Sequence, residues 1–162
     1  FAVITEFNMK TIKMLVYALV AALPCVSCDW GRDGDEDQLR EDVDSFAVHY
    51  FNWRYADAVA YCTGESLPWL QFAASNVHQE DVDSLRAKNE DAQIELGDIE
   101  WQDNDSLATI EITVSDFLQM DTIGKVARLT DKANFCLPMV KRDGRWMVRM
   151  GSPLRSETQS RD

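Results

Sequence analysis

The stretch that decides the fold is Ala108-Thr109-Ile110-Glu111-Ile112-Thr113-Val114-Ser115. Its side chains alternate strictly between apolar and polar, which predicts a strand with one buried face and one face in water. The apolar face needs a covering layer, and that layer must come from the rest of the chain.

Further strands are predicted on both sides of this stretch. Residues 92–101 alternate with period two, and Gly97 shifts the phase of the pattern, which indicates a β-bulge. Residues 135–139 alternate in the same way and predict a third strand. Asp143-Gly144 then predicts a tight hairpin into a fourth strand, residues 146–150.

The chain before residue 90 has a helical pattern instead. Apolar residues recur at three- and four-residue steps over residues 41–62, which predicts one long helix. Two short helices are expected over residues 66–77, with Ser66 as the cap, and over residues 80–88. Helices followed by strands indicate an α+β domain, with a long N-terminal helix and short helices packed on a curved antiparallel sheet of about four strands.

Two features concern the outside of this sheet. Residues 115–120 break the alternation and are expected to form a rim or an assembly edge. The polar positions of the strands form an outer face on which the chain could pair as a homodimer or meet another protein. These positions are Thr109, Glu111, Thr113 and Asn134.

The order of elements, closed by Lys141-Arg142-Asp143-Gly144-Arg145-Trp146-Met147-Val148, resembles the nuclear-transport-factor-2-like, or cystatin-like cone, fold that ketosteroid isomerase-like domains share. Tyr61-Cys62-Thr63-Gly64-Glu65-Ser66 and Phe72-Ala73-Ala74-Ser75-Asn76 resemble small lipoproteins of gut bacteria with this fold and no assigned activity. The resemblance covers about residues 41–153. It implies a pocket between the long helix and the concave sheet face, in a family that includes both enzymes and binding or assembly modules.

The N-terminal region is typical of an export signal. Lys10 and Lys13 precede a short apolar run, residues 14–23, which is too short to span a bilayer as a mature helix. Cys25-Val26-Ser27-Cys28 resembles the lipobox of bacterial lipoproteins, so Cys28 is the expected lipidation site. The alternative is an ordinary secretory signal. Residues 1–8 form an upstream extension, and a lipid-anchored protein on the periplasmic face or cell surface of the outer membrane is expected.

The segments that flank the domain are polar. Residues 29–40 are acidic and contain two glycines, which predicts a flexible tether between Cys28 and the domain. Residues 154–162 are expected to form a polar C-terminal tail. The sequence therefore divides into residues 1–28, 29–40, 41–153 and 154–162.

Composition excludes one class of partner. The chain has 28 acidic and 16 basic residues. If the signal is cleaved off, Glu6, Lys10 and Lys13 are removed with it. The remaining chain has 27 acids and 14 bases, a formal charge of −13. Such a chain repels phosphate, so no nucleic-acid partner is expected.

The cysteines and histidines do not predict a metal or cofactor site. Cys62 and Cys136 could form a disulfide after export, but the strand pattern places Cys136 on the face opposite to the core. His49 and His78 lack the close spacing that zinc ligands need, so no metal or cofactor is expected. Both histidines are expected to be surface or capping residues.

Two charged residues of the first helix are candidates for a pocket. Arg54 falls on the apolar stripe, so it either pairs with a carboxylate or presents its guanidinium to an anionic ligand. Asp57 precedes Tyr61 by one turn and could reach inward as a base, although an exposed carboxylate is the simpler interpretation.

Aromatic residues complete the candidate set, although residues of this kind mostly form core. The ligand-pocket candidates are Tyr50, Arg54, Asp57, Tyr61, Trp69 and Trp146, with no catalytic residue assigned. The favoured hypothesis is a non-enzymatic envelope lipoprotein that binds a small molecule or an envelope protein. The alternatives are a ketosteroid isomerase- or dehydratase-like enzyme acting in the cone, and an assembly or immunity-type interaction module.

Overall fold

The computed structural model describes residues 30–102, 104–120 and 124–158. The chain divides into two compact units, Phe1–Asp35 and Glu36–Asp162. In the first unit, only the beginning of helix α2 is among the described residues; the expected signal and Cys28 lie outside them. The second unit contains the fold described below.

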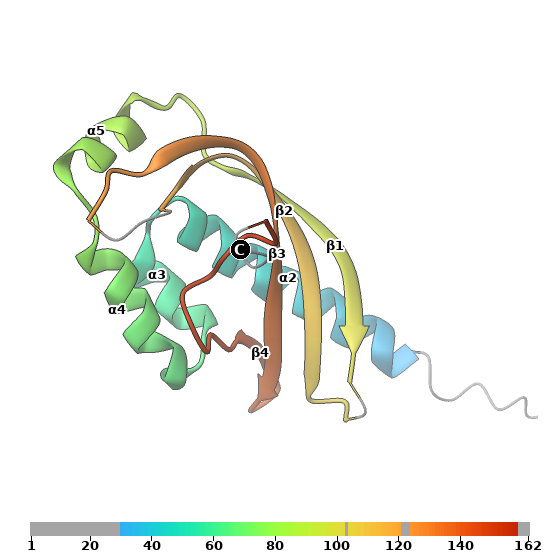
Figure 1. Cartoon of the computed structure of the whole chain (residues 1–162). Coiled ribbons are helices and arrows are strands. Elements are labelled where there is room, and N and C mark those ends of the chain that lie inside the picture. Colours follow the sequence, from blue (N-terminus) through green and yellow to red (C-terminus); the bar gives the residue numbers. More distant parts are fainter. Residues whose placement is uncertain (1–29, 103, 121–123, 159–162) are drawn as a thin grey trace, which may run out of the picture. The chain divides into compact units, whose positions relative to one another are not determined.

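Among the described residues, four helices precede a four-stranded sheet, with two short 3-10 turns between the helices. The helices are α2 (Trp30–Phe51), α3 (Tyr55–Ala58), α4 (Leu67–Ser75) and α5 (Gln79–Ala87), and the 3-10 turns are η1 (Val59–Tyr61) and η2 (Gly64–Ser66). The strands are β1 (Gln93–Trp101), β2 (Leu107–Gln119), β3 (Arg128–Arg142) and β4 (Arg145–Val148). The strands are antiparallel in the order β1-β2-β3-β4. Figure 1 shows the long strands bending together, with α3 and α4 inside the bend. The predicted α+β class with a curved antiparallel sheet is confirmed.

The predicted alternation of β2 and the predicted bulge in β1 are confirmed. Ile110, Ile112 and Val114 are buried, while Glu111 between them is exposed. The register of β1 against β2 shifts between Leu96 and Ile99. A Cβ on Gly97 would lie 3.0 Å from the backbone oxygen of Glu111, so only glycine fits there without movement of the strands.

The predicted hairpin is also confirmed. Asp143 and Gly144 have φ values of 53° and 79°, which is the pair of positive angles that a two-residue type I′ turn requires. The turn joins β3 to β4, with Arg142 opposite Arg145. Strand β3 begins well before the predicted residue 135, at Arg128.

The end of β2 differs from the expected rim. Asp116 has a φ of 53°, and this left-handed residue reverses which side chains face inward. Phe117 and Gln119 are buried beyond it, and both pair with β3, opposite Thr130 and Arg128. Residues 117–120 therefore form part of an interior wall rather than an assembly edge, whereas Asp116 is exposed.

The beginning of the first helix differs from the expected tether. The helix runs from Trp30, and Leu39 is fully buried although it falls within residues 29–40. Leu39 lies one turn before Val43 and continues the same apolar stripe. Arg40 also donates from Nη1 to the Gly97 carbonyl oxygen at 3.0 Å, which ties the helix to the β1 bulge. Composition suggested a tether because most residues around Leu39 are polar. Burial of this one leucine nevertheless holds the segment against the core.

The predicted single helix over residues 41–62 is wrong, because helix α2 ends at Phe51. Trp53 has a φ of 60°. Its N–H donates to the Tyr50 carbonyl oxygen at 3.1 Å, and the Arg54 N–H donates to the His49 carbonyl oxygen at 2.8 Å. These two bonds form a Schellman-type helix end with tryptophan in the position that glycine usually takes.

Ser66 does not cap helix α4 through its side chain, although it occupies the N-cap position. Its buried hydroxyl accepts the Met150 N–H at 2.8 Å and donates to the Val148 carbonyl oxygen at 3.2 Å. The last predicted helix, α5, begins at Gln79, close to the predicted position. At its start, the His78 N–H donates to Asp81 Oδ2 at 2.8 Å.

The C-terminal segment is part of the domain rather than a free tail. Ser156 is buried, and the Glu157 N–H donates to the Asn134 carbonyl oxygen at 3.0 Å. Leu154 packs against the core. The folded region therefore extends beyond the predicted boundary at residue 153.

The core lies between α2 and the sheet. Phe46, Ile110, Leu137 and Trp146 are among its fully buried members. Within the described ranges, no helix combines the length and apolar character needed to cross a membrane.

Candidate functional site

A hollow of about 740 Å³ opens between the end of α2, helix α4, the end of β2, the beginning of β3 and residues 153–158. A cavity of this volume is typical of small-molecule sites. Two left-handed residues position the walls of the hollow. Helix α2 ends just before Trp53, and β2 changes its inward-facing side chains at Asp116, so side chains that follow each residue line the hollow.

The inner wall of the hollow is aromatic. The ring centroids of Phe51 and Phe135 lie 4.7 Å apart, and Phe117 lies 5.5 Å from Phe51 and 5.8 Å from Phe135. Tyr50 and Tyr55 meet edge to face at 5.5 Å. Such mutual contacts hold the rings in place, so the wall is preformed rather than assembled by a ligand.

Trp53 joins this wall to the strand opposite. Its indole Nε1–H donates to the Leu118 carbonyl oxygen at 3.1 Å. This bond, together with stacking against Tyr55 at 6.3 Å, offsets the cost of about 1–2 kcal/mol for a left-handed tryptophan.

A row of polar side chains crosses the hollow. Thr130 Oγ1 donates to Gln119 Oε1 at 3.0 Å, and Gln119 Nε2 donates to Ser156 Oγ at 3.4 Å. The three residues come from β3, β2 and the C-terminal segment. They give an otherwise aromatic site a few fixed hydrogen-bonding groups.

The tyrosines of the hollow stay neutral at physiological pH. Burial raises the pKa of Tyr50 to about 12, against a smaller opposite effect of its hydrogen bond to the Leu154 backbone. Burial also raises the pKa of Tyr55, and the nearby Tyr50 and Asp81 add to this shift. Both hydroxyls can therefore take part in neutral hydrogen bonds.

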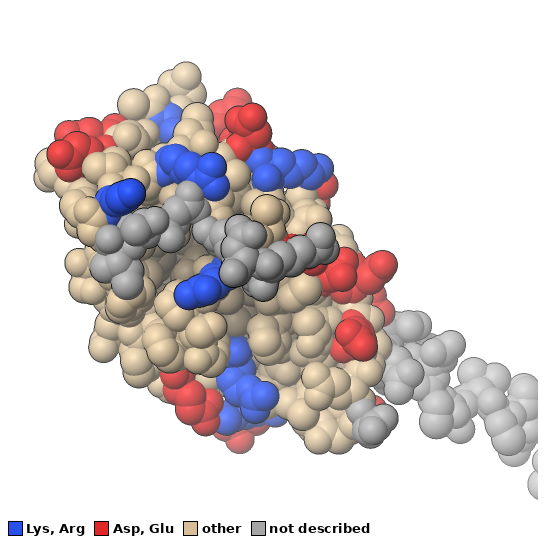
Figure 2. All heavy atoms as spheres, viewed as in Figure 1, with Lys and Arg blue, Asp and Glu red and all other residues tan. Residues whose placement is uncertain are grey.

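The charges around the hollow have one sign. Arg128, Lys132 and Arg155 line it, whereas no aspartate or glutamate is among its described lining residues. Figure 2 shows Lys and Arg side chains beside the hollowed centre of this face, with Asp and Glu side chains mainly at its margin. The hollow also has no histidine or cysteine among those residues.

No protein-family model and no curated protein matches this sequence. The chain is similar to a solved structure of a variant of Rv3472, a protein of unknown function from Mycobacterium tuberculosis, with 12% sequence identity and a TM-score of 0.49. The match covers 82% of this chain and 78% of that one.

Of the six candidates predicted from the sequence, the structure places only Tyr50 in the hollow. Trp69 is half-buried against the core. Trp146 is fully buried with its ring edge-on to Trp101, 5.7 Å away, so it belongs to the core.

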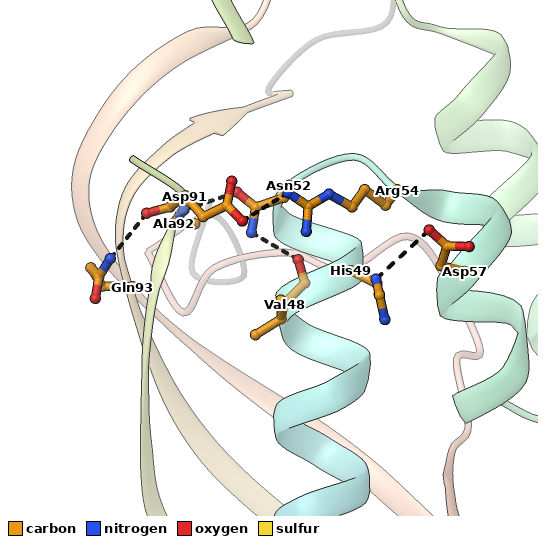
Figure 3. A network of polar contacts seen from close by, with 8 residues as sticks. All are labelled: Val48, His49, Asn52, Arg54, Asp57, Asp91, Ala92 and Gln93. Atoms are coloured by element: carbon orange, nitrogen blue, oxygen red, sulfur yellow. Dashed lines mark hydrogen bonds and ion pairs between the residues drawn. The ribbon is translucent and has the colours of Figure 1, made fainter. Parts of the chain in front are cut away.

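Arg54 is an exposed surface residue rather than a buried member of the stripe, because the helix ends before it. Its Nη2 lies 2.8 Å from Asp91 Oδ2. The neighbouring Asn52 accepts the Ala92 N–H at 2.9 Å and donates to the Val48 carbonyl oxygen at 2.8 Å. Figure 3 shows these contacts joining the end of α2 to the beginning of β1, so Arg54 has a structural role.

Asp57 is also outside the hollow. Its side chain is 65% exposed, and its Oδ2 lies 3.9 Å from His49 Nδ1, as Figure 3 shows. His49 stacks on Tyr61 with ring centroids 5.8 Å apart. This group lies at the surface beside α3 and supplies no base to the hollow.

One cluster on the outer sheet face has metal-ligand atoms within 4.8 Å of one another, in Glu111, Cys136 and Glu157. Both described cysteines are free, and Cys136 is exposed as the strand pattern predicts. Burial and then the neighbouring carboxylates raise the pKa of Cys136, which favours the thiol over the thiolate that binds metal. Its Sγ–H donates to Glu157 Oε1 at 3.7 Å.

The basic lining residues could not be found by the periodicity used for the rest of the sheet. Arg128, Thr130 and Lys132 alternate in sequence, which is the only signal available. That short polar stretch lacks the apolar face that marks a strand. Arg155 falls in a segment that its composition assigns to a tail.

The pH dependence of stability should report the buried state of Tyr50. Its folded pKa of about 12 exceeds the unfolded value of 10.0, so its contribution is complete below pH 10 and is lost as pH rises towards 12. In that window, Tyr50→Phe should make the fall in unfolding free energy shallower by about 1.4 kcal/mol per pH unit. Urea unfolding at several pH values measures both slopes; equal slopes would contradict the burial of the hydroxyl.

Proposed function

We propose that this protein is a non-enzymatic binding module whose hollow takes a small molecule with an aromatic or other apolar body. The observation that carries the proposal is the 740 Å³ hollow, with a preformed aromatic wall and a few fixed polar groups. Within the α+β class, a nuclear-transport-factor-2-like cone is the finer fold assignment that we propose, on the resemblance of the sequence.

An isomerase or dehydratase of the ketosteroid type is less well supported. Such an enzyme needs a base within reach of its substrate, and a carboxylate usually supplies it. The described lining of the hollow offers tyrosines but no carboxylate, and Asp57 is at the surface. The neutral tyrosines and the polar row suit binding.

The outer sheet face gives less support to an assembly or homodimer role. Its polar groups bond one another, with Thr113 Oγ1 donating to Asn134 Oδ1 at 3.0 Å. Glu111 is exposed there, and a face of this kind lacks the apolar centre of stable interfaces.

Location in the cell envelope, with a lipid anchor at Cys28 in the outer membrane, remains part of the proposal. It is supported by the Cys25-Val26-Ser27-Cys28 pattern and the basic, then apolar, residues before it. Incorporation of labelled palmitate that is lost in Cys28→Ala is its test; equal labelling of the two proteins would remove this part.

The binding proposal can be tested with N-phenyl-1-naphthylamine, a neutral aromatic probe that fluoresces when it leaves water. We expect saturable binding to the full chain. Ala133→Trp should abolish it, because Ala133 lines the hollow and an indole would fill the space. Phe72→Ala, which removes a lining ring, should weaken it about tenfold.

The matched control is Ala87→Trp, which adds the same ring at an exposed position at the end of α5. This variant should bind the probe as the parent does. Circular dichroism and thermal unfolding of each variant establish that it is folded. Unchanged binding by folded Ala133→Trp, or no binding by the parent chain, would overturn the proposal.

A further inference from the structure

We infer that the ligand of the hollow is an amphipathic anion, whose apolar body lies on the aromatic wall and whose carboxylate or sulfonate group is held by Arg128 and Arg155. This inference rests on the proposed binding function and specifies its ligand class.

The charge of the hollow opposes that of the chain. Acids outnumber bases by 28 to 16 in the sequence, for a formal net charge of −12. The described lining nevertheless has three basic residues and no acidic one. An acidic surface repels anions in general, whereas a basic hollow in it attracts them.

The cations come from two segments that meet at one residue. Arg128 lies opposite Gln119 in the β2–β3 register, and Thr130 bonds the same Gln119 side chain. On the other side, Gln119 bonds Ser156, whose chain neighbour is Arg155. Arg128 and Arg155 therefore flank the polar row, whereas Lys132 lies opposite Ser115 and reaches Glu95.

This placement separates an apolar region from a charged one. The rings of Phe51, Phe117 and Phe135 form the inner wall, and the cations lie at exposed positions of the lining. Arginine forks suit carboxylate and sulfonate oxygens, and the hydroxyls and amide of the polar row supply further donors. A ligand with one anionic end and an aromatic or aliphatic body matches both regions at once.

The ammonium of Lys132 is turned away from the hollow. Its Nζ lies 3.8 Å from Glu95 Oε2. Glu95 lies opposite Thr113 on the outer sheet face, between Ile94 and Leu96, which pack against the core. Arg155 has no ion-pair partner among the described residues.

The experiment compares two probes with nearly the same body. 8-Anilino-1-naphthalenesulfonate is N-phenyl-1-naphthylamine with an added sulfonate, so the difference in their affinities reports the anion. We expect the full chain to bind the sulfonate about tenfold more tightly than the neutral probe. Raising the salt concentration from about 50 to 500 mM should weaken the sulfonate alone.

Variants identify the residues that hold the anion. Arg155→Gln should weaken sulfonate binding about three- to tenfold and leave the neutral probe unchanged. Lys132→Gln, which removes an ammonium that pairs with Glu95 on the outer face, should affect neither probe. The neutral probe thus also reports that each variant is folded. Arg86→Gln is the matched control, because it removes one cation from an exposed position of α5 outside the hollow and should affect neither probe.

The outcomes separate the two proposals. If neither probe binds, the binding function fails and the inference with it. If the neutral probe binds and the sulfonate binds no better, or if Arg155→Gln leaves the sulfonate unaffected, the inference is overturned while the binding function stands. Tighter, salt-sensitive sulfonate binding that Arg155→Gln weakens supports the inference.

Discussion

Trp146→Ala is expected to lower the free energy of unfolding by about 3–5 kcal/mol, because it removes a fully buried indole from the centre of the core. Trp146 lies on β4, edge-on to Trp101 at 5.7 Å, and its backbone N–H donates to buried Asp42 Oδ2 at 3.2 Å. Neighbouring rings cannot collapse into so large a space without losing their own contacts. Urea unfolding at neutral pH measures the loss.

Trp69→Ala is the matched control for this variant. It deletes the same side chain from a half-buried position on α4, so the loss should stay below about 2 kcal/mol. Because Trp146 is outside the hollow, the folded fraction of Trp146→Ala should bind N-phenyl-1-naphthylamine with the parent affinity. Equal losses for the two tryptophans would contradict the assignment of Trp146 to the core.

Leu39→Ala should lower the free energy of unfolding by about 2–5 kcal/mol. Leu39 is 0% exposed and packs in the core cluster with Val43 and Phe46, although it lies in a segment whose composition suggests a solvated tether. The same denaturation experiment measures the effect. A large loss means that helix α2 contributes to the core before residue 41.

Leu129→Ala is the control for this prediction. Leu129 is on β3 and is 61% exposed, so removal of the same atoms should change the unfolding free energy by less than about 0.5 kcal/mol. If Leu39→Ala cost no more than Leu129→Ala, residues before Glu41 would have to be a tether as their composition suggests.

The strands and their turns could be predicted because their signals are local. The apolar–polar alternation over residues 108–114 matches the two-residue period of a strand. Gly97 has a close contact and Asp143-Gly144 has backbone angles that few other residues tolerate. The α+β class follows from the order of these patterns. None of these predictions required knowledge of distant neighbours.

The helix break could not be predicted in this way. Nothing in the sequence near Trp53 signals a helix end, since the residue in the left-handed position is a tryptophan rather than a glycine. The conformation is stabilised by a hydrogen bond to Leu118, which is 65 residues further along the chain. The break also explains why Arg54 is not a buried residue, since the helical stripe that placed it inside ends before it.

The candidate site was missed for the same reason. Five segments contribute to the hollow, and two of them, at residues 128–132 and 153–158, have sequences that look like loop and tail. Their side chains become lining residues only through the left-handed turn at Asp116 and the contacts of Ser156 and Glu157. Among the six sequence candidates, Tyr50 alone is a described lining residue of the hollow.

The sequence by itself determined the α+β class, the strand alternation, the bulge and the hairpin, because local backbone geometry and solvent contact control these features. Only the tertiary structure decided where helix α2 starts and ends, which side chains surround the hollow, and that its described lining has basic but no acidic residues in an acidic chain. Those properties depend on pairs of residues far apart in sequence, whose energies arise only once burial brings the segments together.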